Sequence, residues 1–287
     1  MKIQDVSYYP TLKDHLKRTV AFAIEEDVAD GDITAHLIPA GQTAEATIIT
    51  KQDAVVCGQA WVEEVFRQID PSVTLRWHVE DGDSVTDRQV LVEIHGNARS
   101  ILTAERCALN FLQTLSGTAT VAAQYAQAAK GTNLTILDTR KTIPGLRLAQ
   151  KYAVKVGGCE NHRLGLYDMF LIKENHIAAA GGITQVVEKC AEIAPNSKIM
   201  VEVETLEEFQ EASKANIDFI MLDEFADGQI IQAIEMSPTQ SLEISGGLEL
   251  ETIQQKHFAK SVRASVGVMT KRVLAVDLSL RVGALTN

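Results

Sequence analysis

Residues 198–224, KIMVEVETLEEFQEASKANIDFIMLDE, contain two short apolar runs separated by a polar segment of helix length. The runs, KIMVEVE and DFIMLDE, have the length and composition of buried strands. Strands that alternate with helices are typical of parallel sheets whose strands are joined by right-handed crossovers. Each run also has a carboxylate at or near its end, Glu202 in the first and Asp223 in the second.

The same alternation continues on both sides of this stretch. Four further apolar runs are followed by polar segments: LTILD at 134–138, MFLIKE at 169–174, SLEISGG at 241–247 and SVRASVG at 261–267. In an α/β barrel the carboxyl ends of the strands converge on one rim, where the functional site lies. Periodicity alone therefore predicts that six strands direct their ends at one ligand.

The first hundred residues have a different pattern. Strand-like runs, AEATIITKQDAVVCG, VTLRWHVEDGDSV and QVLVEIHG, are bounded by Gly or Asp turns, and one helix, WVEEVFRQID, interrupts them. From Ser100 a long Ala-rich segment has helical periodicity, with Thr103 as its expected N-cap and a break expected at Gly117. The acidic stretch EEDVADGDIT lacks the ligand spacing of an EF-hand, so we interpret it as capping and turn chemistry.

The composition excludes several classes of protein. The chain has 287 residues, a formal net charge of -11 and four cysteines without CxxC spacing. Its apolar runs are too short to cross a bilayer, and the N-terminus lacks the pattern of a secretory signal. Nucleic-acid binding normally requires a broad basic surface. We expect neither a membrane nor a nucleic-acid partner, and a reducing cytoplasm is the expected location.

One block of the chain departs from the acidic background. Residues 138–176, DTRKTIPGLRLAQKYAVKVGGCENHRLGLYDMFLIKENH, contain seven Lys and Arg against four Asp and Glu. A local excess of cations in an acidic protein concentrates anions at one place. The sequence therefore predicts a small ligand with several negative charges.

The cations of this block differ in what they can bind. Arginine presents a planar fork that suits carboxylate or phosphate, whereas lysine presents a compact charge. Arg140 and Lys141 directly follow a predicted strand, and Lys173 interrupts an apolar run, where burial is costly without an anion. The alternative for each is a solvated loop charge. Arg163 belongs to the same set, while His162 is as compatible with a structural role as with ligand binding, and Cys159 is expected to be a packed residue.

Glu202 and Asp223 end neighbouring predicted strands in an otherwise cationic pocket. Two carboxylates there suit Mg²⁺, which often bridges to substrate phosphates. Ion pairing with nearby lysines is the alternative. The last two predicted strands end in Ser245-Gly246-Gly247 and Ser265-Val266-Gly267, and glycines at such turns allow backbone N–H groups to approach a phosphate. Paired turns at the last strands match the usual phosphate site of a barrel.

These motifs together closely resemble the quinolinate phosphoribosyltransferase family. The resemblance rests on the block from TRKTIP to LIKENH, with EDVADGDIT, ERCALNFLQTLSGTAT, VEVE, LDEF, SGGL and SVGVMT in the same order, and it covers nearly the whole chain. It implies carboxylating transfer of a phosphoribosyl group from phosphoribosyl pyrophosphate (PRPP) to quinolinate, with Mg²⁺. The products would be nicotinate mononucleotide, pyrophosphate and carbon dioxide, a step of NAD biosynthesis.

The resemblance also implies a fold and residue roles. The fold would be an N-terminal α/β sandwich domain, residues 1–112 completed by about 276–287, beside an incomplete α/β barrel of about six strands, residues 113–275. A homodimer is implied, with Arg106 acting in the neighbouring subunit's site. The implied catalytic residues are Lys141, Glu202 and Asp223, the last two also holding the metal. The implied substrate-binding residues are Arg106, Thr139, Arg140, His162, Arg163 and Lys173, and the implied phosphate-binding residues are Ser245, Gly246, Gly247, Val266, Gly267 and Val268.

Four positions depart from the family pattern: Glu224, Cys159, Lys271 and Arg263. Glu224 adds an anion beside the proposed metal ligands, and Arg263 places a charge inside a barrel strand.

Three other functions are alternatives. A related family associated with molybdenum transport shares the TRK block but typically lacks the lysine that is Lys173 here. A Schiff-base lyase would use Lys173 as its nucleophile. A sensor that had lost catalysis would be expected to lose Glu202 or Asp223, and both are present.

Overall fold

The computed structural model describes residues 2–286 and divides into two compact units. The first contains the residues up to Ala123, Thr142–Gly158 and the residues from Met269 onward. The second contains Gln124–Lys141 and Cys159–Val268. The domain boundaries expected after residues 112 and 275 remain a prediction. The first and last residues of the expected N-terminal domain, Met1 and Asn287, lie outside the described residues.

The first unit is built on a four-stranded antiparallel sheet in the order β12-β1-β5-β3, in which β12 near the end of the chain pairs with β1. Its strands are β1 (Thr43–Thr50), β3 (Thr74–Trp77), β5 (Val90–Asn97) and β12 (Leu278–Thr286), and β2 (Ala54–Val55) pairs with β4 (Ser84–Val85). Its helices are α1 (Tyr9–Val28), α2 (Gln59–Ile69), α3 (Ala98–Ala128, which continues into the second unit) and α4 (Arg147–Val156), with the short turns η1 (Ile3–Asp5) and η2 (Ala35–Leu37).

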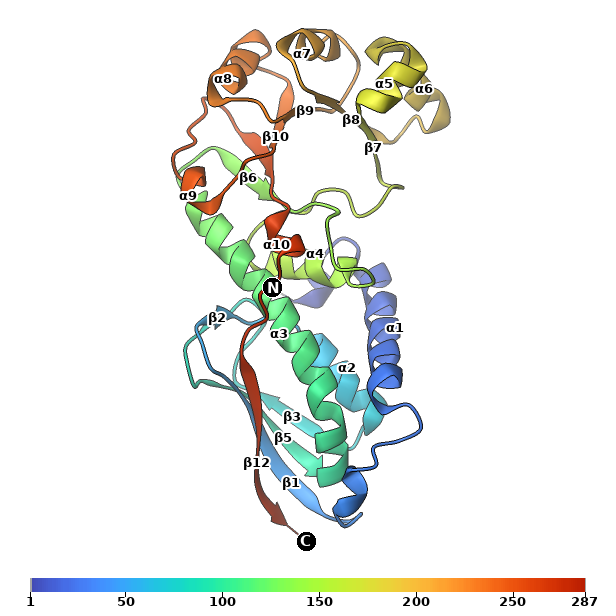
Figure 1. Ribbon diagram of the computed structural model, residues 1–287, viewed down its shortest axis with the longest axis vertical. Helices are drawn as coiled ribbons and strands as arrows, with labels where there is room; N and C mark the ends of the chain where they lie inside the picture. Colours follow the sequence, from blue (N-terminus) through green and yellow to red (C-terminus); the bar gives the residue numbers. More distant parts are fainter. Residues whose placement is uncertain (1, 287) are drawn as a thin grey trace. The chain divides into compact units, whose positions relative to one another are not determined.

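Helices α2 and α3 pack on the sheet of this unit (Figure 1). Trp61 and Phe66 of α2 share a core with Ile48 of β1 and Ile101 of α3, and all four are almost fully buried. Burying one such side chain contributes about 1.5–3 kcal/mol, so this apolar layer stabilises the unit.

The long helix differs from its expected form at its start. It begins at Ala98, so Thr103 lies inside it and is not its N-cap. The Thr103 hydroxyl instead donates to Oδ2 of Asp32 at 2.9 Å. The other oxygen of Asp32 accepts the N–H groups of Thr34 and Ala35, which confirms capping and turn chemistry in the acidic stretch.

The expected break at Gly117 was also wrong, because α3 runs through it without interruption. A Cβ added to Gly117 would overlap the carbonyl oxygen of Leu274. Glycine is therefore needed for the close approach of a distant segment, and it does not end the helix.

Gly117→Ala should consequently destabilise the protein by about 1–3 kcal/mol, because the added methyl group overpacks against backbone. Thermal unfolding of the variant measures the loss. Gly41→Ala is the matched control, since no atom lies within 4 Å of its added Cβ. Equal melting temperatures for the two variants would show that the segment at Leu274 yields without cost.

The second unit is a parallel sheet of six strands in the order β6-β11-β10-β9-β8-β7. The strands are β6 (Leu134–Leu137), β7 (Met169–Ile172), β8 (Lys198–Val203), β9 (Phe219–Asp223), β10 (Ser241–Ser245) and β11 (Val262–Ser265). All six were predicted from the apolar runs. No ladder joins β6 to β7 within residues 2–286, so the barrel is incomplete, and the predicted fold class is confirmed.

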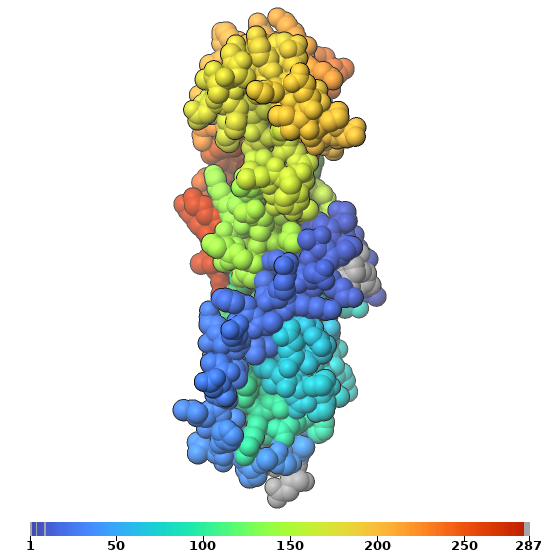
Figure 2. All heavy atoms as spheres, turned by 90° about the vertical axis from the view of Figure 1, so that its right-hand side faces the viewer, coloured from blue at the N-terminus to red at the C-terminus, as the bar shows by residue number. Residues whose placement is uncertain are grey.

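Helices cover the outside of this curved sheet (Figure 1). They are α5 (Glu174–Ala180), α6 (Ile183–Ile193), α7 (Leu206–Ala212), α8 (Asp227–Met236) and α9 (Leu250–Ile253), and α10 (Val268–Lys271) follows β11. Figure 2 shows the segments of α5 to α7, yellow to light orange, at the surface. In the part of the chain that the structure describes, no helix is long and apolar enough to cross a membrane.

Strand register places the polar residues of the sheet on one face. Directly paired residues point to the same side, and so do residues two apart on a strand. Glu202 pairs with Met221, which pairs in turn with Glu243, and Glu243 pairs with Arg263. Asp223 lies two residues beyond Met221 and therefore shares this face. The residues that alternate with these along the strands, such as Leu222 and Ile244, point to the opposite side.

Candidate active site

The carboxyl ends of four neighbouring strands lie level with one another. Leu137 pairs with Ser265, Ser265 with Ser245, and Ser245 with Asp223. The turns that follow these strands therefore begin at the same edge of the sheet, as the sequence predicted.

The turn after β6 carries the first cations of the basic block. Thr139 Oγ1 accepts the N–H of Lys141 at 3.1 Å, which tightens this turn. A Cβ added to Gly267 would lie 3.4 Å from both Thr139 Oγ1 and the Lys141 side chain. The turn after β11 thus lies against the turn that carries Lys141. The N–H of Val266 already donates to the carbonyl of Leu137 at 2.8 Å, and Val268 follows at the start of α10.

The turn after β10 contains two glycines with positive φ, 91° at Gly246 and 59° at Gly247. A Cβ on Gly246 would overlap the carboxylate of Glu224. Glu224 itself has a φ of 55°, and its N–H donates to the carbonyl of Ser245 at 2.9 Å. The departure at Glu224 therefore places an anion directly against the glycine turn.

Arg140 and Arg163 form a concentration of positive charge. The Nε of Arg140 is buried and has no hydrogen-bond partner among the described residues. Burial first, and then the charge of Arg140, lower the pKa of Arg163. A buried N–H without a partner costs free energy, and like charges repel, so both observations favour an anion at this place.

Lys173 and Glu202 form an ion pair across neighbouring strands. Lys173 directly follows β7, and its Nζ lies 2.7 Å from each oxygen of Glu202, whose side chain is only 8% exposed. This is the geometry of an ammonium ion bound to a carboxylate, which argues against a neutral nucleophilic lysine. The ion-pairing alternative for Glu202 is therefore present in the structure.

The donor set at Glu202 and Asp223 fits a magnesium ion bound mainly through substrate. Both carboxylates lie on the same face of adjacent strands. No group of three or more His, Cys, Asp or Glu able to hold a metal occurs in residues 2–286. Mg²⁺ usually retains waters and uses one or two carboxylates plus phosphates, so two suffice.

His162 is buried and fixed from several sides. Its backbone N–H donates to Oδ1 of Asp138 at 2.9 Å, and Asn161 Nδ2 donates to Oδ2 of Asp138 at 2.7 Å. Its Nδ1 accepts the N–H of Arg163 at 2.8 Å, and its Nε2 lies 3.1 Å from Oε1 of Glu243. The segment that leads to Arg163 is therefore held by buried carboxylates.

Glu243 lies next to the candidate site, and the sequence alone does not point to it. It is fully buried on β10, where Arg263 Nε donates to it at 2.8 Å and the Ser265 hydroxyl also donates to it. Burial alone would raise the pKa of Glu243, but His162, Ser265 and Arg263 together hold that pKa below its ordinary value. The only indication of it in the sequence is a glutamate inside one apolar run and an arginine inside the next, and the structure pairs these two residues in register.

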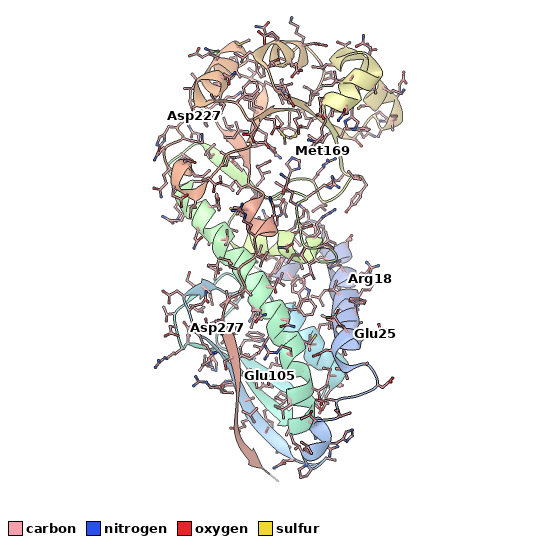
Figure 3. The ribbon with its side chains drawn as sticks, in the orientation of Figure 1. Arg18, Glu25, Glu105, Met169, Asp227 and Asp277 are labelled. Atoms are coloured by element: carbon pink, nitrogen blue, oxygen red, sulfur yellow. The ribbon has the colours of Figure 1, made fainter. Side chains whose placement is uncertain are left out.

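Arg106 belongs to the other compact unit. It lies on α3 and is exposed, with Nη2 3.7 Å from the carboxylate of Glu105, which is labelled in Figure 3. An exposed pair of this kind contributes little to stability. Lys271, the remaining departure, is exposed on α10.

Cys159 is buried beside the site, as expected for a packed residue. Burial, and then the charges of Asp138 and Glu160, raise the pKa of its thiol to about 12. At pH 8 only about one thiol in ten thousand would be ionised, and the thiolate is the reactive form.

We therefore expect no modification of Cys159 by a disulfide reagent such as DTNB at pH 8 in the native protein. After unfolding in guanidinium, all four cysteines of the chain should react. Mass spectrometry of the labelled peptides identifies the modified residues. Rapid native labelling at Cys159 would contradict the burial seen here.

Comparisons with known proteins agree with one another. The family model "Quinolinate phosphoribosyl transferase, C-terminal domain" matches residues 118–281, and the corresponding N-terminal model matches residues 32–116. A probable nicotinate-nucleotide pyrophosphorylase [carboxylating] of Bacillus subtilis is 37% identical over 269 residues, 93% of each chain. Quinolinate phosphoribosyltransferase [decarboxylating] 1 of Nicotiana glauca is 39% identical over 289 residues, 93% of this chain and 82% of the relative.

A solved structure gives the same result. The nicotinate-nucleotide pyrophosphorylase from Francisella tularensis superimposes with a TM-score of 0.91 at 42% identity, covering 99% of both chains. The chain belongs to the quinolinate phosphoribosyltransferase family.

Proposed function

We propose that the protein transfers a phosphoribosyl group from PRPP to quinolinate and releases pyrophosphate and carbon dioxide, giving nicotinate mononucleotide. The observation that carries the proposal is the buried N–H of Arg140 that has no hydrogen-bond partner among the described residues, together with the charge of Arg140 lowering the pKa of Arg163 after burial does so. A dicarboxylate neutralises both guanidinium groups and accepts that N–H. The family assignment supports the same reaction.

Quinolinate is held by the cations of the basic block. Arg140 and Arg163 pair with its carboxylates, with Lys173 and Thr139 beside them. His162 belongs to this half of the site. Because the Lys173 ammonium is already bound to Glu202, only part of its positive charge acts on the carboxylates of quinolinate.

PRPP occupies the other half of the site. Its 5′-phosphate lies at the glycine turns formed by Ser245, Gly246, Gly247, Val266, Gly267 and Val268. Lys141 faces the reacting phosphates, because its side chain lies against Gly267. Glu202 and Asp223 hold Mg²⁺, which when bound supplies positive charge at the pyrophosphate oxygens.

The reaction follows from holding the two substrates in line. Lys141 stabilises the charge that develops on pyrophosphate as the bond from ribose C1 to the leaving oxygen breaks. The pyridine nitrogen of quinolinate donates its electron pair to that carbon. The 2-carboxylate then leaves as carbon dioxide, its bonding pair remains on the ring beside the cationic nitrogen, and a proton from solvent completes the product. Positioning of this kind can contribute roughly 7–11 kcal/mol.

The active form is a homodimer in which Arg106 completes the quinolinate site of the partner subunit. The exposed position of Arg106 on α3 is compatible with this role. The reducing cytoplasm is the proposed location, and four buried cysteines that form no disulfide with one another suit it.

The deciding experiment supplies the purified protein with quinolinate, PRPP and Mg²⁺ and follows nicotinate mononucleotide and carbon dioxide. We expect both products in equal amounts, and no nucleotide when nicotinate replaces quinolinate. Product from nicotinate, or none from quinolinate, would overturn the proposal. Borohydride should trap no adduct at Lys173.

A further inference from the structure

The carboxylate of Glu243 connects three elements of the barrel. It is fully buried on β10 and contacts Arg263 and Ser265 of β11. It also contacts His162, which lies two residues after Glu160, where the chain forms a bridge with Leu137 of β6. Arg263 also stacks over the ring of Phe219 with its guanidinium carbon 4.5 Å from the ring centre. This cation is therefore fixed by packing as well as by charge, and it fixes the carboxylate in turn.

The contacts of His162 determine where its ring proton lies. A backbone N–H can only donate, so Nδ1, which accepts the N–H of Arg163 at 2.8 Å, carries no proton. The proton then lies on Nε2, which is 3.1 Å from the Glu243 carboxylate. Nδ1 is thus held by a hydrogen bond on one side of the ring, and Nε2 on the other side lies at ion-pair distance from Glu243, outside ordinary hydrogen-bond geometry.

The backbone leading to Arg163 is held at two points. Asp138, at the end of β6, accepts the N–H of His162. The His162 ring holds the next N–H, that of Arg163, and Glu243 anchors the far side of the ring. A change at Glu243 can therefore reach the Arg163 guanidinium through one imidazole.

We propose that Glu243 is a positioning residue for quinolinate: it selects the His162 tautomer that holds the backbone of Arg163, and His162 acts as this connection. The inference rests on the proposed function, in which Arg163 binds quinolinate. It adds a positioning role to the one expected for His162 and gives the departure at Arg263 a structural purpose.

The variant Glu243→Gln tests the link with almost no change of shape. If the amide oxygen faces His162 and Ser265, its NH₂ group opposes the Nε–H of Arg263. If the amide is turned over, its NH₂ group opposes the Nε2–H of His162. Either orientation sets a donor against a donor, and a lost buried hydrogen bond corresponds to a change of roughly tenfold. We expect the KM for quinolinate to rise by about this factor, with the KM for PRPP unchanged.

The double variant Glu243→Gln/Arg263→Met makes the test specific. Without the Arg263 donor, the amide can turn its oxygen to His162 and Ser265 with no conflict. The KM for quinolinate should then fall back toward the wild-type value. Arg263→Met alone removes one support of Glu243 and should raise this KM less than Glu243→Gln does. A double variant no better than Glu243→Gln, or equal losses for both substrates, would overturn the proposal.

A second measurement does not depend on turnover. ¹⁵N shifts of histidine-labelled protein report the tautomer, with the His162 signal assigned by its loss in His162→Gln. We expect an unprotonated Nδ1 and a protonated Nε2 in the wild type, and the reverse tautomer or a mixture in Glu243→Gln. A protonated Nδ1 in the wild type overturns the inference. Wild-type protein with the expected tautomer but no activity on quinolinate would instead overturn the proposed function alone.

Discussion

Glu202→Gln is expected to lower kcat by about 10²–10³-fold, because it removes a negative charge that both Lys173 and the proposed magnesium ion need. The Lys173 ammonium, bound by both oxygens of Glu202 at 2.7 Å, would keep only one good acceptor. The proposed magnesium site would lose one of its two carboxylates. Steady-state kinetics over a range of Mg²⁺ concentrations measures both effects, and the Mg²⁺ needed for half-maximal activity should rise.

Glu204→Gln is the matched control for this variant. Glu204 is exposed just beyond the end of β8, and it should keep wild-type kinetics. The two roles of Glu202 separate in the background of Lys173→Met, where no ion pair remains to be broken. If Glu202→Gln adds no further loss there and leaves the Mg²⁺ dependence unchanged, Glu202 serves only Lys173 and the metal site must lie elsewhere.

The barrel strands could be predicted because parallel strands are buried on both faces and read as short apolar runs. Their ends were also readable, since residues such as Asp223 and Ser245 follow directly in the sequence, and register places them level. What could be predicted was thus set by local periodicity and by one general property of parallel sheets.

The errors in the long helix have the opposite origin. Gly117 looks like a local helix break in the sequence. A glycine is needed there instead because the backbone at Leu274, far along the chain, lies against it. Thr103 was read as a cap, but its hydroxyl serves Asp32. Contacts between distant segments decide both positions, and one sequence does not show such contacts.

Arg263 shows a third situation. Its charge inside a strand was noticed, but without its partner it indicated only poor packing. Glu243 alone, within an apolar run, looks like part of an ordinary strand. The register that pairs the two residues turns two apparent irregularities into one buried ion pair, which costs desolvation and is stable only with further hydrogen bonds. Ser265 and His162 supply these, and for that reason the pair lies next to the site.

The second large effect concerns Arg106. Arg106→Ala and Lys141→Ala should each lower kcat/KM by about 10²-fold or more, because each removes a cation from a polyanion site. If Arg106 serves the partner subunit, a mixed dimer of the two variants contains one site with both cations intact. Random exchange in an equal mixture should then restore about a quarter of the wild-type sites, following the symmetry of a two-fold dimer. The experiment mixes the variants under conditions of subunit exchange and follows activity with time.

The inverse mixture supplies the control, because it reverses the direction of the expected change. When wild type is mixed with the double variant Arg106→Ala/Lys141→Ala, each wild-type subunit in a mixed dimer receives no Arg106 from its partner. About a quarter of the sites should remain active if Arg106 acts across the interface, against about half if it acts within its own subunit. No recovery in the first mixture, together with half activity in the second, would place Arg106 in the site of its own chain. Recovery in the first and loss in the second can arise only from an arginine supplied by the partner subunit.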